Sequence, residues 1–393
     1  MSRTISVGID IGTYQTRVVA AESAHEGERE FPKVVGVGFS ESRGLHHGCI
    51  LNQPDAVKSI RQAVAQASKA AGFPITRAVV SIGGIGLSCV TSSGTVVITK
   101  ADLEITELDV NKALEISEQE IPASLSLNRV ILHPVVLQYK IDGKPILGRP
   151  EGLKGSKLEV RTLFITCFEH HRNELIEAFA EAGVEVEDMV ASPIAASLVT
   201  LTKQQKMAGV VLANIGSETV SIAVFENNLP ISLEVFPIGG NDITNDIALG
   251  LRIPLDEAEG IKRGSLIGGN FSRKRLDEIV EARLSDIFEL IEAHLKKLGR
   301  SGLLPAGIVL TGGGSAIETA SDLAKATLRL PSRVASVSFG DNIRGQIKDA
   351  SWSVAYGLCI IGLQNGDEEP ISGLTLVKKT KKGLMNFLRQ FLP

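Results

Sequence analysis

The sequence contains two similar stretches: Val7-Gly8-Ile9-Asp10-Ile11-Gly12-Thr13 and Val211-Leu212-Ala213-Asn214-Ile215-Gly216-Ser217. Each is an apolar run that ends in a polar residue, isoleucine, glycine and a hydroxyl residue, and each leads into a second apolar run, at 17–20 and 221–224. Such runs around a short turn predict two strands joined by a tight connection. Because the unit occurs twice, the sequence predicts two halves that begin alike.

Strands and helices alternate around these units. Residues 54–71 and 173–182 have the apolar spacing of amphipathic helices, and 77–82 and 158–168 read as strands. This alternation predicts an α/β fold with mostly parallel sheets. The stretch 85–160 breaks the rhythm: a hairpin-like run at 87–99, an acidic helix at 109–119 and two strands within 129–141 predict a small inserted α+β module.

Composition excludes several classes of protein. The 393 residues are 44% hydrophobic and 22% charged, which is an ordinary globular balance with length for two to four domains. A net charge of -4 without an arginine-rich stripe argues against nucleic acid as a partner. The four cysteines are far apart, and the adjacent pairs His46–His47 and His170–His171 do not share a face, so we expect no zinc site. No secretory segment or bilayer-spanning run is present, which favours the cytosol.

The turns after the repeated strands have the chemistry of phosphate sites. In the first turn, Asp10, Gly12, Thr13 and Tyr14, the glycine admits a phosphate close to the backbone, and N–H groups and the Thr13 hydroxyl can donate to it. Asp10 can hold a water of hydrated Mg²⁺. The second turn, Asn214 to Thr219, would face the same phosphates through Gly216, Ser217, Glu218 and Thr219.

A third motif, Gly312-Gly313-Gly314-Ser315, follows the apolar strand 307–310 and could carry the nucleoside end of the same ligand. One such turn alone is common in ordinary hairpins. Three in this order are explained by one nucleotide held between two lobes, and neither a Walker lysine loop nor an early G-x-G-x-x-G is present.

These motifs resemble the phosphate, connecting and adenosine motifs of the actin, DnaK-type chaperone and sugar kinase superfamily. Within it, the whole chain resembles the FtsA family of bacterial cell-division proteins. The residues that carry this closer resemblance are 93–97, 105–110, 152–159, 237–248 and 258–262.

The resemblance implies a two-lobed, actin-like α/β fold with duplicated β-sheet cores and an inserted α+β subdomain, 1C, in the first lobe. It implies subdomain 1A at 1–84, 161–193 and 352–365, 1C at 85–160, 2A at 194–238 and 305–351, and 2B at 239–304. A flexible linker at 366–381 and an amphipathic helix at 382–393 would follow.

The resemblance also implies ligands and partners. Gly239 and Gly240 would approach the phosphates of ATP, and Glu259, Lys262 and Arg263 would lie near its ribose and adenine. The protein would polymerise with itself and bind the tubulin-like protein FtsZ. The FtsZ site would lie on a helix of the second lobe that carries Arg275, Glu278 and Arg283.

Three positions depart from the superfamily pattern. Asn214 stands where actin-like proteins commonly have aspartate, Ser192 stands where the chaperones have glutamate, and Gln15 stands where many relatives have lysine or asparagine. An amide or a hydroxyl cannot supply the negative charge that helps hold hydrated Mg²⁺ or orient the attacking water. We therefore expect ATP binding with slow or absent hydrolysis.

The C-terminal residues have the pattern of a membrane-binding helix. An apolar stripe of Leu384, Phe387, Leu388, Phe391 and Leu392 at helical spacing follows a lysine cluster that includes Lys381 and Lys382. Lysines beside such a stripe suit an anionic lipid surface. So short a helix binds weakly, so we expect firm attachment to need several copies. A final core helix is the alternative interpretation of the segment.

The leading interpretation is an ATP-binding adaptor that holds FtsZ filaments at the cytoplasmic face of the cell membrane. One alternative is a PilM-like scaffold of type IV pilus machinery, which would not need the lysine-rich tail. The other is a sugar kinase of the same superfamily, which would need a catalytic aspartate for the acceptor hydroxyl.

Overall fold

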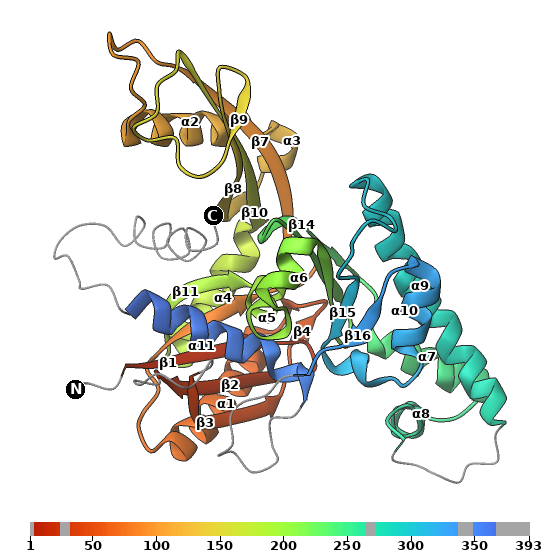
Figure 1. Cartoon of the computed structure of the whole chain (residues 1–393). Helices are drawn as coiled ribbons and strands as arrows, with labels where there is room; N and C mark the ends of the chain where they lie inside the picture. The colour runs from red at the N-terminus through yellow and green to blue at the C-terminus, as the bar shows by residue number, and fades with distance from the viewer. Residues whose placement is uncertain (1–3, 24–31, 265–271, 337–348, 367–393) are drawn as a thin grey trace.

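The computed structural model describes residues 4–23, 32–264, 272–336 and 349–366 (Figure 1). Their strands form three larger sheets and one short hairpin, β4 (Leu45–His46) with β5 (Cys49–Ile50). Two of the larger sheets form the cores of two lobes. The third belongs to a module that projects beyond lobe one (Figure 1).

The sheet of lobe one has the order β11-β6-β1-β2-β3. Its strands are β1 (Ile5–Ile11), β2 (Gln15–Glu22), β3 (Lys33–Glu41), β6 (Arg77–Ile82) and β11 (Glu185–Ala191). Helix α1 (Gln53–Ala71) packs on β2 and β3, and α11 (Ser353–Gly366) packs on β1, β2 and β6. Helix α4 (Glu169–Glu181) packs beside α1 and precedes β11.

The sheet of lobe two has the order β14-β13-β12-β15-β16. Its strands are β12 (Val210–Ile215), β13 (Val220–Glu226), β14 (Leu229–Phe236), β15 (Ile308–Thr311) and β16 (Ser332–Val334). The helices α7 (Gly240–Leu251), α8 (Leu255–Lys262), α9 (Arg273–Lys297) and α10 (Ala320–Leu328) lie on the outer side of this lobe (Figure 1).

The alternating side chains of β12 separate two cores, because successive residues of a strand point to opposite faces. Val210 and Leu212 belong to the large core that includes lobe one. Val211 and Ala213 belong to the core formed with α9, which contributes Phe288 and its neighbours. The sheet of lobe two is therefore buried on both faces, which explains why its first strand is apolar from Val210 to Ala213.

The two lobe sheets have the same topology, which confirms the two-lobed, actin-like α/β fold with duplicated sheets. In each, the first strand lies at the centre, is antiparallel to the next strand and is parallel to a later one: β1 to β6, and β12 to β15. The expectation of mostly parallel sheets was wrong, because only two of the four strand pairs in each sheet are parallel. Short turns can join only antiparallel neighbours, so each strand–turn–strand unit adds antiparallel pairs.

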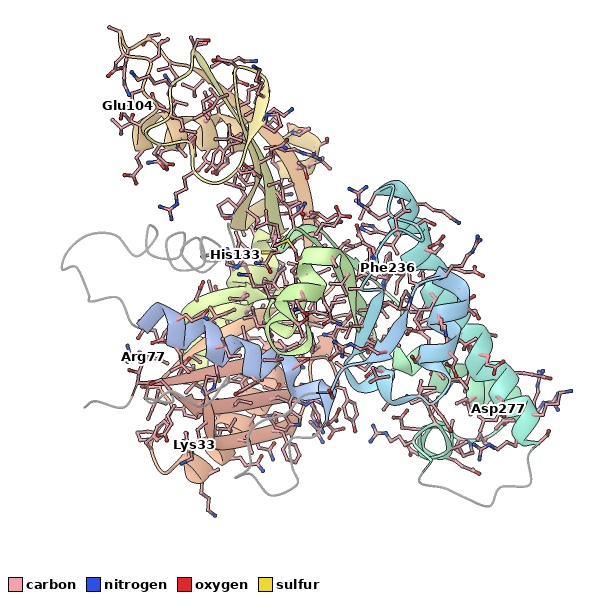
Figure 2. All side chains as sticks on the ribbon, viewed as in Figure 1. Lys33, Arg77, Glu104, His133, Phe236 and Asp277 are labelled. Atoms are coloured by element: carbon pink, nitrogen blue, oxygen red, sulfur yellow. The ribbon has the colours of Figure 1, made fainter. Side chains whose placement is uncertain are left out.

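The inserted module contains the antiparallel sheet β7-β10-β8-β9. Its elements are β7 (Ser88–Val97), α2 (Glu107–Gln119), α3 (Ala123–Ser126), β8 (Arg129–Ile141), β9 (Lys144–Ile146) and β10 (Lys157–Phe168). The outer half of this sheet forms a small core of its own with α2, whereas the inner half joins the core of lobe one. Figure 2 shows Glu104 far out on the module and His133 near its base.

Two details of the module differ from the sequence prediction. The hairpin-like run at 87–99 is one strand, β7, and the two strands expected within 129–141 are the single strand β8. Both are continuous because each pairs along its length with β10, and β8 follows β10 through two register shifts rather than breaking. Pairing between distant segments decides such strand lengths.

Two helices connect the lobes. Helix α5 (Ser192–Thr200) leads from lobe one to α6 (Lys203–Ala208) and β12, and the short 3₁₀ helix Ala350–Trp352 leads from lobe two into α11. Helices α5 and α11 pack so closely that a Cβ at Gly357 would lie 2.0 Å from the carbonyl oxygen of Ala195. None of the helices within the described ranges is long and apolar enough to cross a membrane.

Gly357→Ala should therefore destabilise the protein. Its Cβ must displace the backbone of α5, at a cost of about 3 kcal/mol, which exceeds the ~1 kcal/mol that alanine gains over glycine in a helix. We expect a thermal unfolding midpoint several degrees lower, measured by scanning calorimetry. Gln62→Ala on the exposed side of α1 is the control, with an expected change within about 0.5 kcal/mol. An unchanged midpoint for Gly357→Ala would show that the two helices separate readily.

Candidate functional site

The first turn joins β1 to β2 and is closed by a hydrogen bond from the Gly12 N–H to the carbonyl oxygen of Gln15, at 3.2 Å. Asp10 is buried at the end of β1, where it accepts a 2.8 Å hydrogen bond from the Ser81 hydroxyl on β6. Burial raises the pKa of the Asp10 carboxyl, while the nearby charge of Arg17 opposes that shift. A carboxylate held in this way can accept a hydrogen bond from a metal-bound water.

The second turn repeats this geometry in lobe two. The Gly216 N–H donates to the carbonyl oxygen of Thr219 at 2.8 Å, and Asn214 occupies the place in β12 that Asp10 has in β1. The side chain of Asn214 lies against Gly312, where a Cβ would come within 2.3 Å of Asn214 Oδ1. Gly312 also has φ of 84°, so this position requires glycine for two reasons.

The glycine motif after β15 packs on the second turn. It forms a short 3₁₀ helix, Gly313–Ala316, in which the Ser315 hydroxyl donates to the carbonyl oxygen of Gly312 at 2.7 Å. A Cβ at Gly314 would meet the side chain of Ile215 at 2.4 Å, whereas one at Gly313 would meet nothing within 4 Å. The Gly313 backbone is thus the open part of the motif.

The Gly239–Gly240 pair lies on the other side of the second turn. The Gly240 N–H donates to the carbonyl oxygen of Gly216 at 2.9 Å, and the Asn241 N–H donates to that of Ser217 at 2.6 Å. A Cβ at Gly239 would come within 2.6 Å of the Ser217 carbonyl oxygen. Only glycine allows the start of α7 to approach the turn so closely.

Behind this pair, Glu259 and Lys262 of α8 form a polar cluster with α7. Lys262 Nζ donates to the carbonyl oxygen of Gly240 at 2.9 Å and to Thr244 Oγ1 at 2.7 Å, and it pairs with Glu259 at 2.6 Å. Burial alone would raise the pKa of Glu259, but hydrogen bonds from Lys262, Thr244 and Arg263 hold it at about 2. Glu259 is therefore a carboxylate at neutral pH, while burial lowers the pKa of Lys262 and the bond to Glu259 opposes that shift.

Contacts between the lobes bring these groups into one region. The Arg263 guanidinium lies over the ring of Tyr14 in the first turn, 5.0 Å from its centroid. The hairpin 45–50, formed by β4 and β5, touches both turns: the Gly48 N–H donates to Thr13 Oγ1 at 3.0 Å, and the His47 N–H donates to Glu218 at 2.6 Å. The nucleotide-site residues expected from the sequence thus form one connected set.

The sequence reasoning missed the hairpin 45–50 as part of this region. His46 and His47 were expected only not to form a zinc site. The sequence signal for the hairpin was the two glycines Gly44 and Gly48, which are typical of tight turns, and in the structure His47 and Gly48 have positive φ, 47° and 79°. Among the departures noted from the sequence, Ser192 lies buried at the start of α5 and donates to the carbonyl oxygen of Ile82 at 3.0 Å.

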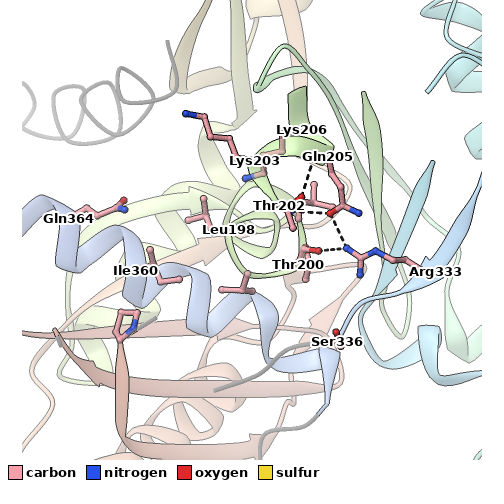
Figure 3. A pocket seen from close by; sticks show the side chains of 13 residues that line it. Leu198, Thr200, Thr202, Lys203, Gln205, Lys206, Arg333, Ser336, Ile360 and Gln364 are labelled. Carbon is pink, nitrogen blue, oxygen red and sulfur yellow. Dashed lines mark hydrogen bonds between the residues drawn. The ribbon is translucent and has the colours of Figure 1, made fainter. Parts of the chain in front are cut away.

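A cavity of about 660 Å³ lies apart from this region, and its lining contains none of the residues expected to bind nucleotide (Figure 3). It is bordered by the far ends of α5 and α11, by α6 and by β16. Arg333 of β16 donates there to the carbonyl oxygen of Thr200 at 2.8 Å and to Gln205 Oε1 at 3.1 Å. The cavity therefore lies beside the connection between the lobes rather than at the paired turns.

The three residues expected to contact FtsZ lie on α9, in different surroundings. Arg275 and Glu278 are exposed and 3.6 Å apart. Arg283 instead forms a two-point ion pair with Asp246 of α7, at 2.7 and 3.1 Å, and a further pair with Asp286 at 3.3 Å. Arg283 thus holds α9 on α7, while the other two side chains face solvent.

The residues expected to contact the membrane lie outside the described ranges: Lys381, Lys382, Leu384, Phe387, Leu388, Phe391 and Leu392. Where the chain is described, no group of three or more His, Cys, Asp or Glu side chains has the arrangement of a metal site.

Comparison with protein families identifies two segments. Residues 211–357 match the model of "Cell division protein FtsA", and residues 84–166 match that of "SHS2 domain inserted in FTSA". The chain is 33% identical over 379 residues to the cell division protein FtsA of Pseudomonas aeruginosa, covering 91% of this chain and 89% of that one. It is 31% identical to FtsA of Bacillus subtilis, covering 91% and 83% of the two chains.

Solved structures share the fold at lower identity. The PilM–PilN type IV pilus biogenesis complex matches with a TM-score of 0.68 at 18% identity, covering 94% of this chain and 100% of that one. MreB5 of Spiroplasma citri bound to ADP matches with a TM-score of 0.51 at 14% identity, covering 91% and 95%. At these identities, the likeness concerns the actin-like fold alone.

Arg283→Ala should lower stability, whereas Arg275→Ala should not. Arg283→Ala removes a half-buried, two-point ion pair between helices, which contributes about 1 kcal/mol to the free energy of unfolding. Arg275→Ala removes an exposed ion pair, whose contribution is smaller. Urea unfolding of both variants measures the difference, and 1 M salt should reduce it. Equal stability of the two variants would contradict a structural role for Arg283.

Proposed function

Because the chain belongs to the FtsA family of cell division proteins, we propose that it binds ATP between its lobes, polymerises at the cytoplasmic face of the cell membrane and holds FtsZ filaments there. The observation that carries the nucleotide part is the paired geometry of the two turns. Each presents a glycine-centred backbone turn at the end of a central strand, and contacts between the lobes join them. The proposal accounts for both turns with one ligand.

The residues present fit a nucleotide with Mg²⁺. N–H groups of the two turns and the Thr13 hydroxyl can donate to phosphate oxygens, because Thr13 Oγ1 only accepts from Gly48. Asp10 can hold a water of the hydrated metal ion. Gly239 and Gly240 leave the backbone open beside the second turn, and the charged pair Glu259–Lys262 can position the ribose. When bound, ATP would supply the negatively charged phosphates that accept hydrogen bonds from the donors of both turns.

We expect the site to bind ATP better than it hydrolyses it. Asn214 and Ser192 supply an amide and a hydroxyl where a carboxylate would help to orient water, and Ser192 is buried and bonded to the backbone. Phosphoryl transfer depends on such positioning and charge. The loss of these carboxylates should therefore lower the rate of ATP hydrolysis more than the affinity for ATP.

The C-terminal residues are the part of the chain that would attach to the membrane. Their lysine cluster and apolar stripe suit an anionic lipid surface, and polymerisation would supply the multiple copies that a weak helix needs.

A scaffold of type IV pilus machinery is the second candidate, which the TM-score of 0.68 favours at the level of the fold. A sugar kinase is the third, and activity on a panel of sugars would support it.

The first prediction from this function concerns hydrolysis. The full-length protein should bind MgATP in isothermal titration and release phosphate slowly in a steady-state assay. Asn214→Asp should raise phosphate release by roughly tenfold or more, since the carboxylate has the shape of the amide and can orient water. Asn214→Ala is the matched control and should bring no gain. Rapid phosphate release by the unchanged protein would contradict the expected role of Asn214.

The second prediction concerns the tail. Co-sedimentation with anionic liposomes should be strong for the full-length protein, weak for a version ending at Leu376, and stronger when FtsZ is added to the full-length chain. Phe387→Glu should reduce binding about as much as the truncation, because it places a charge in the apolar stripe. Gln390→Glu, off the stripe, should reduce it less. Equal binding by the two chain lengths would remove the membrane anchor from the proposal.

A further inference from the structure

We propose that Glu218 is a positioning residue. Its contacts with His46 and His47, which we call the latch, attach the second turn to lobe one, so that the hairpin 45–50 sets the separation of the two turns. The inference rests on the proposed nucleotide site, because that separation is what the phosphates of a bound nucleotide would span. The sequence pattern places Glu218 among the residues that would face the phosphates, but its charge would repel them unless the side chain is held elsewhere.

Both the side chain and the main chain of Glu218 are bound by lobe one. Its Oε2 accepts a hydrogen bond from the His47 N–H at 2.6 Å and lies 3.1 Å from His46 Nδ1. Its carbonyl oxygen lies 3.0 Å from His47 Nδ1, and a ring with its proton on that atom donates to it. His47 and Glu218 are 171 positions apart in the sequence, and their contacts are made directly between protein atoms. The contacts therefore do not depend on a ligand.

The hairpin that binds Glu218 is fixed within lobe one. The Gly48 N–H donates to Thr13 Oγ1, and the Ile85 N–H donates to the carbonyl oxygen of His47 at 3.2 Å. A Cβ at Gly48 would lie only 2.5 Å from the Cα of Gly84, so the hairpin lies directly on the connection between β6 and β7. The hairpin therefore moves with lobe one and the first turn.

The latch gives Glu218 two effects on the site. It removes a carboxylate from the side of the turn that faces phosphates, because a hydrogen bond from a backbone N–H to a charged oxygen is among the stronger ones in proteins. It also holds the turn 216–219 at a fixed place relative to Thr13. A site held in the binding arrangement has a higher apparent affinity than one that reaches it only part of the time.

Hydrogen exchange of the full-length protein without nucleotide tests the contact. Glu218→Ala should speed the exchange of the His47 amide by roughly tenfold, since that N–H loses its acceptor. Glu218→Gln retains an acceptor oxygen and should restore protection. Glu226→Ala is the matched control: Glu226 has a similarly exposed side chain, 23% against 19%, but pairs with Arg300 within lobe two. Unchanged exchange in Glu218→Ala would overturn the latch.

Titration with MgATP tests the positioning role. Glu218→Ala should weaken binding by about tenfold, whereas Glu218→Gln and Glu226→Ala should bind as the unchanged protein does. If the His47 amide of Glu218→Ala exchanges faster but the variant binds MgATP equally well or more tightly, the positioning role is overturned. Repulsion of the phosphates by the Glu218 carboxylate would then outweigh the latch. If the unchanged protein does not bind MgATP, the proposed nucleotide site fails, while the exchange experiment still decides whether the latch exists.

Discussion

The same backbone hydrogen bond closes the equivalent turn in each lobe: a glycine N–H donates to the carbonyl oxygen three residues later, from Gly12 to Gln15 and from Gly216 to Thr219. Each bond closes a turn at the carboxyl end of the central strand of its sheet. Because β6 and β15 run parallel to these strands, their carboxyl ends reach the same edges and bring the segments after Ile82 and Thr311 to the turns. Ligand sites in α/β sheets form at such edges.

The two copies of the turn have diverged in charge. The first retains a buried carboxylate, Asp10, in a polar contact with Ser81. The second has an amide at the corresponding place, Asn214, and a carboxylate four residues later that is bound by the hairpin 45–50. Both turns retain neutral backbone N–H groups, the kind of donor that the proposed phosphate site would use. The difference between the copies therefore affects the groups that would orient water more than those that would hold a ligand.

Charged residues on α9 show how a sequence pattern and a packed structure differ. Arg275, Glu278 and Arg283 look equivalent as charges on one helix. In the structure, Arg283 binds Asp246 through two nitrogen atoms and ties α9 to α7, whereas the other two are exposed. Membership of the FtsA family establishes a cell division protein, and among these three residues Arg275 and Glu278 are the more exposed.

Local patterns in the sequence were sufficient to predict several elements of the fold. The repeated strand–turn–strand unit predicted two equivalent lobes, helical spacing predicted α1 and α4, and the break in rhythm after Gly84 predicted an inserted module. Local patterns did not predict that β7 and β8 are single strands, because pairing with the distant strand β10 sets their length. Only the tertiary structure placed His47 on Glu218, because no local periodicity connects residues 171 positions apart, and such a contact forms only when both lobes have folded and met.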